Sequence, residues 1–245
     1  GDVYKRQVAR AVLADLGVSV PLVGISKPRT EHAKGDRGAT DWLTAWVAGG
    51  RIAFLSYMDG WPHLYSIAET GGQPLLLTPG PYMAEYVKVS ADGRHLVFAG
   101  NAGEDPDDID RRHIVRVPVD RAAPEMLTAG KGLEWTPVFT GDGATIAFIS
   151  ATAQRPPLPA VLGAADRQAR LLGEDRIPAD FPAARLVTPR KIILKAPDGV
   201  SVHAQLFTSG ANRAPRPAII YIHGGPMRQM LLGWHYSDYY ANAYA

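Results

Sequence analysis

Residues 86–98 read YVKVSADGRHLVF, with a strand-like run on each side of the dipeptide Asp92-Gly93. Asp-Gly between two such runs is a strong signal for a β-hairpin, because glycine readily adopts the backbone conformation that a tight turn requires. The dipeptide recurs as Asp142-Gly143, and Leu96-Val97-Phe98 recurs as Ile146-Ala147-Phe148, in both cases fifty residues later. The shared spacing indicates an internal repeat.

Other parts of each unit repeat as well. The triplet His63-Leu64-Tyr65 matches His113-Ile114-Val115, and Leu77-Thr78 matches Leu127-Thr128, again fifty residues apart. Each unit contains four short strands, which is typical of a β-propeller blade of ~40–50 residues. The alternative is a β-sandwich in which the similarity arises by chance, and four landmarks that share one offset count against it.

The repeat predicts which residues are equivalent. Ile52-Ala53-Phe54 precedes the corresponding strand of the second unit by only 44 residues, because that unit has a longer loop over residues 100–112. We therefore expect residues 41–173 to form consecutive antiparallel four-stranded sheets. Three phenylalanines are expected to be buried at equivalent positions: Phe54, Phe98 and Phe148.

Residues 218–226 read AIIYIHGGP, an apolar run that ends in a histidine and two glycines. This pattern is typical of a buried strand that leads into a tight loop. In α/β-hydrolases such a loop supplies amide N–H groups to the oxyanion hole, and glycine lets the substrate approach the backbone. We interpret His223, Gly224 and Gly225 as this oxyanion loop, with the N–H of Gly225 as the donor.

The chain contains no Gly-x-Ser-x-Gly nucleophile elbow, and its first methionine is Met58. We expect it to be an interior fragment of a mainly β protein whose catalytic triad lies beyond residue 245. A hairpin is predicted over residues 192–207, around Asp198-Gly199. Three parts follow: a non-native leader (1–7), the C-terminal blades of a β-propeller plus a connector (8–189), and the truncated start of an α/β-hydrolase domain (190–245).

Composition excludes several other functions. A net charge of +2 with interspersed signs gives no basis for nucleic-acid binding, and the chain has no cysteine. No apolar run reaches the ~18 residues that a membrane span requires. The histidines lack metal-ligand spacing, and the acidic residues 104–110 lack the spacing of a calcium loop, which favours a solvated hairpin tip. We expect no metal or cofactor. Compartment and oligomeric state stay open.

Residues 59–65 read DGWPHLY, and residues 223–226 read HGGP. Propeller blades that carry the first motif and lead into the second resemble the prolyl oligopeptidase family of serine peptidases, over about residues 41–245. The histidine of HGGP is similar to the acylaminoacyl-peptidase branch, because dipeptidyl peptidases usually have tyrosine there. The paired glutamates by which dipeptidyl peptidases hold a substrate's amino terminus are not identifiable, so the subfamily stays open.

This resemblance implies hydrolysis of short peptides through an acyl-enzyme, with a Ser-His-Asp triad and a propeller that covers the active site. Two other functions stay open. One is a non-catalytic β-propeller binding protein with a degenerate hydrolase segment, and the other is an esterase or lipase. Trp234 and His235 follow the oxyanion loop and are candidates for the substrate pocket. For His223, a structural hydrogen-bonding role is favoured over proton transfer.

Overall fold

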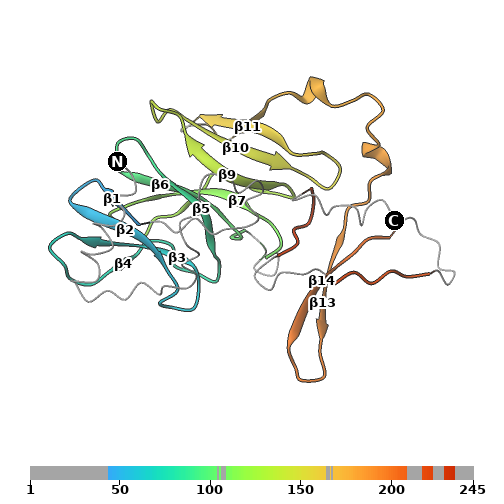
Figure 1. Cartoon of the computed structure of the whole chain (residues 1–245), viewed down its shortest axis with the longest axis horizontal. Helices are drawn as coiled ribbons and strands as arrows, with labels where there is room; N and C mark the ends of the chain where they lie inside the picture. Colours follow the sequence, from blue (N-terminus) through green and yellow to red (C-terminus); the bar gives the residue numbers. More distant parts are fainter. Residues whose placement is uncertain are drawn as a thin grey trace, which may run out of the picture.

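The fold consists mainly of antiparallel β-sheets. The computed structural model describes residues 44–103, 105, 109–163, 166, 168–208, 217–222 and 229–234. Three four-stranded sheets lie side by side (Figure 1), which confirms the prediction of consecutive blades. Their strands follow chain order: β1 (Thr44–Val47), β2 (Arg51–Ser56), β3 (His63–Ala68) and β4 (Leu75–Leu76); β5 (Ala84–Val89), β6 (His95–Gly100), β7 (His113–Pro118) and β8 (Glu125–Met126); β9 (Leu133–Phe139), β10 (Thr145–Ala151), β11 (Leu158–Gly163) and β12 (Arg170–Leu171).

The Asp-Gly turns of the second and third sheets are built alike. The Asp92 carboxylate accepts hydrogen bonds from the Ser90 hydroxyl at 2.6 Å and from the Arg94 amide at 3.0 Å. The Asp142 carboxylate accepts an equivalent pair at the same distances. These hydrogen bonds hold the pKa of both carboxyls below the usual value for aspartate. In each turn the following glycine has φ of 70°, which explains why the dipeptide recurs.

A threonine completes the hydrogen bonding of the third strand in each of the first two sheets. The Leu64 amide donates to Thr78 Oγ1 at 2.9 Å, and the Ile114 amide donates to Thr128 Oγ1 at 2.8 Å. The fourth strands β4 and β8 have two residues each, so they pair with only part of their neighbours. The threonine side chain therefore takes the place of a strand partner where the fourth strand has ended.

The first strands of the second and third sheets contain β-bulges at equivalent positions. Tyr86 and Thr136 have φ of 54° and 52°, and the strand register shifts beside each of them. A left-handed backbone is unfavourable for residues other than glycine, so the surrounding sheet must hold these two residues in place. The bulge in β5 lies next to Glu85, whose carboxylate enters the polar network described below.

The core lies between the sheets, and β6 contributes to it on both faces. Phe98 packs with Leu64 and other residues of the first sheet, whereas Val97 packs with Ile146 of the third. Alternation along the strand sends neighbouring side chains to opposite faces. The three equivalent phenylalanines are all buried, as predicted: Phe54, Phe98 and Phe148.

The third sheet is followed by an irregular connector and a hairpin. The connector contains two 3₁₀ helices, η1 (Glu174–Arg176) and η2 (Ala183–Arg185). Strand β13 (Arg190–Lys195) then pairs with β14 (Ser201–Leu206) in an antiparallel hairpin that projects away from the three sheets in Figure 1. This hairpin confirms the one predicted around Asp198-Gly199.

The predicted buried strand at residues 218–222 is wrong. Residues 217–222 form no strand, and Ile220 and Ile222 expose 87% and 86% of their surface. An apolar run becomes a buried strand only when neighbouring strands supply hydrogen-bond partners and cover its faces. In the part of the chain that the structure describes, no strand pairs with this run, and a hydrolase sheet is not visible.

Shortening a core phenylalanine should destabilise the sheets. Phe98→Ala removes a fully buried ring between the first two sheets. We expect it to lower the free energy of unfolding by about 3–5 kcal/mol, measured by urea denaturation. The matched control is Val138→Ala on β9, because Val138 is 43% exposed. That variant should stay within about 0.5 kcal/mol of the wild type. Equal losses in both variants would contradict the packing described here.

Candidate functional site

The residues predicted to form the site fall only partly within the described structure. His223, Gly224 and Gly225 of the predicted oxyanion loop lie outside the described residues, as does His235. Trp234 is described, at the end of the segment 229–234. This docking segment contacts the second and third sheets, so it shows how the chain that follows the predicted loop meets the propeller.

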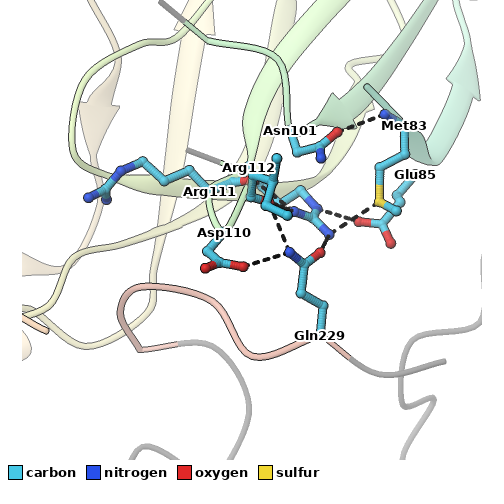
Figure 2. Close-up of polar contacts among 8 residues, drawn as sticks. Met83, Glu85, Asn101, Asp110, Arg111, Arg112 and Gln229 are labelled. Carbon is cyan, nitrogen blue, oxygen red and sulfur yellow. Dashed lines mark hydrogen bonds and ion pairs between the residues drawn. The ribbon is translucent and has the colours of Figure 1, made fainter. Parts of the chain in front are cut away.

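The Arg112 side chain lies at the centre of a polar network that joins the docking segment to the second sheet (Figure 2). Its Nε donates to the Glu85 carboxylate on β5. Its Nη2 donates to Oε1 of Gln229 at 2.8 Å and lies 3.3 Å from Sδ of Met83, while Nη1 donates to two backbone carbonyls of its own loop. Arg112 is only 3% exposed, so these partners replace water around the guanidinium charge.

Gln229 uses its side-chain amide as both acceptor and donor. Its Oε1 accepts from Arg112, and its Nε2 donates to Oδ1 of Asp110 at 2.7 Å and to the Ile109 carbonyl oxygen at 3.0 Å. The backbone carbonyl of Asp110 also accepts the Leu232 amide at 3.0 Å. The loop before β7 therefore holds the docking segment at two points, one through a side chain and one through the backbone.

The apolar half of the docking segment packs on the third sheet. Leu231 and Leu232 are buried. A Cβ atom at Gly233 would lie 3.0 Å from Cδ1 of Leu133 and 3.1 Å from the backbone of Thr152, so only glycine fits there without displacement. The Trp234 amide donates to the Thr152 carbonyl at 3.2 Å. The segment is thus held by close backbone contact as well as by the Arg112 network.

The ring of Trp234 packs near the connector. Its centroid lies 6.0 Å from that of Phe181, at a tilted angle. Nε2 of Gln205 on β14 donates to the Met230 carbonyl at 2.8 Å. The connector and the second hairpin therefore both contact the docking segment. The assignment of Trp234 to a substrate pocket stays a prediction.

A serine, a histidine and an aspartate come together at the turn between β2 and β3. Nδ1 of His63 lies 2.6 Å from Oδ2 of Asp59, and Ser56 is opposite His63 in the strand pairing. Burial raises the pKa of Asp59, but the hydrogen bonds from His63 and the Trp61 amide outweigh it, so the pKa is lowered. Ser56 and His63 are buried, so a substrate cannot reach them, and the cluster stabilises the turn.

A hollow beside β8 and β10 is lined in part by Glu134, which pairs with the buried His113. The Glu134 carboxylate in this hollow is held by Nδ1 of His113 at 2.9 Å and by the Thr128 hydroxyl at 3.2 Å. Its charge therefore already has partners.

Among the described residues, no group of three or more acidic or histidine side chains could hold a metal ion. Nor does that part of the chain contain a helix long and apolar enough to cross a membrane.

No sequence pattern pointed to Arg112 or Gln229, the central residues of the network. The interpretation of residues 104–110 as a solvated tip is wrong at Asp110. That residue is 4% exposed because the docking segment covers it. Arg112 and Gln229 are 117 positions apart, so no local pattern links them. The available signal was the extra length of the loop over residues 100–112, since insertions in repeat proteins often carry function.

Part of the chain matches a known family model. Residues 39–157 match the family model described as the dipeptidyl peptidase IV N-terminal region. The resemblance to prolyl oligopeptidase-type peptidases inferred from the sequence is thereby confirmed at the family level. No curated protein matches the chain.

Three solved structures share the fold. A puromycin-hydrolysing peptidase of Mycobacterium tuberculosis is 18% identical, with a TM-score of 0.62 over 82% of this chain and 31% of that one. A puromycin hydrolase is 14% identical, with a TM-score of 0.54 over 66% and 24%. Porphyromonas gingivalis dipeptidyl peptidase 4 is 20% identical, with a TM-score of 0.53 over 66% and 22%. The chain spans less than a third of the length of each.

Adding one methyl group to the docking segment should displace it. In Gly233→Ala the new Cβ meets the Thr152 backbone, which cannot move aside easily. Such overpacking costs about 1–3 kcal/mol, so we expect proteolytic cleavage within residues 230–233 to be about tenfold faster. Gly141→Ala is the control, because a Cβ there meets nothing within 4 Å. Unchanged cleavage in Gly233→Ala would show that the segment is not packed as described.

Proposed function

We propose that this chain, whose residues 39–157 match the dipeptidyl peptidase IV N-terminal region, is the part of a serine peptidase where a β-propeller meets the catalytic domain. The observation that carries the proposal is the position of the docking segment. It begins three residues after His223-Gly224-Gly225-Pro226 and is bound to the second and third propeller sheets. The predicted oxyanion loop would therefore be tied to the propeller by the chain that follows it.

In the proposed reaction the backbone N–H of Gly225 donates to the oxygen of the tetrahedral intermediate, with Gly224 leaving room for the substrate. A serine attacks the peptide carbonyl, a histidine takes the serine proton and gives it to the leaving amine, and an aspartate orients the histidine. The acyl-enzyme is then hydrolysed by water. The serine is not in these 245 residues, since they contain no Gly-x-Ser-x-Gly sequence.

The proposed substrates are short peptides. A propeller beside the active site would admit short, flexible chains and exclude folded proteins. We place the propeller blades and connector in residues 8–189 and the start of the hydrolase domain in residues 190–245. Trp234 and His235 would lie where the two parts meet and line the substrate pocket. Two proteins of the same fold are a puromycin hydrolase and a puromycin-hydrolysing peptidase, which supports hydrolysis as the proposed reaction class.

A covalent probe tests whether the complete protein is a serine hydrolase. A fluorophosphonate should label it at the serine of a Gly-x-Ser-x-Gly sequence and abolish hydrolysis of short peptide amides. The 245-residue chain alone should be neither labelled nor active, because an oxyanion donor without a nucleophile has no intermediate to stabilise. A folded complete protein that resists the probe would instead be a propeller binding protein with a degenerate hydrolase segment.

The oxyanion role of Gly225 can be tested in the complete enzyme. Gly225→Val places a branched side chain where the substrate carbonyl must approach the backbone. Loss of one oxyanion donor costs about 10²–10³ in kcat, so we expect a fall of this size in kcat/KM. Gly141→Val is the control, since Gly141 lies on an open turn of the third sheet. Wild-type kcat/KM in Gly225→Val would exclude this residue from the oxyanion hole.

A further inference from the structure

The Arg112 network joins three stretches of chain that are far apart in the sequence. Glu85 comes from the bulged strand β5, Arg112 and Asp110 from the long loop before β7, and Gln229 from the docking segment. Figure 2 shows the guanidinium between the Glu85 carboxylate and the Gln229 amide. Because Arg112 and Asp110 are both almost fully buried, each must find its partners within the protein.

We propose that Arg112 and Gln229 are positioning residues, and that their contact sets the place of the docking segment on the propeller. This inference rests on the proposed function, in which the docking segment begins four residues after Gly225 of the oxyanion loop. The contact would let the propeller fix the position of the chain directly after that loop.

The chemistry of the network requires a neutral amide at position 229. Arg112 presents a donor to Gln229, and Asp110 presents a carboxylate oxygen 2.7 Å away on the other side. An amide satisfies both, because its oxygen accepts and its nitrogen donates. A carboxylate could accept from Arg112 but would repel Asp110. The other charged groups of the network are Glu85, bound to Arg112, and Arg111, which donates to the Lys131 carbonyl.

The substitution Gln229→Glu tests this requirement in the 245-residue chain. Hydrogen exchange of the Leu232 amide, which donates to Asp110, reports docking without any need for catalysis. At pH 7 we expect exchange about tenfold faster than in the wild type, because the buried Asp110 loses the Gln229 donor and two carboxylates face each other. At pH 4.5 a larger share of the introduced carboxyl is protonated and can donate to Asp110 again, so exchange should move back toward the wild-type rate at that pH.

Two further variants and an internal reference complete the test. Gln229→Met keeps the volume without the amide, so it should exchange faster at both pH values. Gln73→Glu makes the same change at an exposed position between β3 and β4 and should have no effect. Amides of β6 report global unfolding and should stay protected in every variant. Wild-type exchange at pH 7 in either Gln229→Glu or Gln229→Met would overturn the proposal. Failure of the fluorophosphonate test would overturn the proposed function while leaving this result intact.

Discussion

A four-stranded sheet with apolar side chains on both faces is stable in water only when another sheet covers each face. Strand β6 shows the constraint most clearly, since Phe98 faces the first sheet and its neighbour Val97 faces the third. The burial of both side chains requires a sheet on each side of β6. The fifty-residue repeat places successive sheets along the chain so that each can pack against the next. The loops that leave the sheets can then vary in length without disturbing the core, as the loop before β7 does.

That variable loop is where the fold connects to the candidate site. It carries Asp110 and Arg112 to a point between β5 and the docking segment. There the buried Arg112 guanidinium needs hydrogen-bond acceptors from both neighbours. A buried guanidinium has a large desolvation cost, which is offset only by well-placed acceptors. The network therefore determines where the docking segment binds more than it adds to the free energy of unfolding. Its members come from both sides of the proposed domain boundary.

The parts of the fold that could be predicted from the sequence are those set by neighbours along the chain. Asp92 and Gly93 form their turn through contacts within four residues, so the motif alone identified the hairpin and its copies. The run at residues 218–222 looked like a strand by the same reasoning, but a strand also needs partners, and none pairs with it among the described residues. Arg112 and Gln229 could not be paired in advance, because only the folded chain brings them together.

The short fourth strands have a consequence for how molecules of this protein meet one another. Each sheet ends on one side in a two-residue strand, β4, β8 or β12. In the first two sheets a threonine hydroxyl already accepts the next free amide of the neighbouring strand. A second molecule therefore finds almost no continuous row of unpaired backbone groups there on which to add a strand of its own. In a crowded cell this rim would resist intermolecular strand addition, the first step toward aggregated β-structure, even though the sheets are rich in apolar residues.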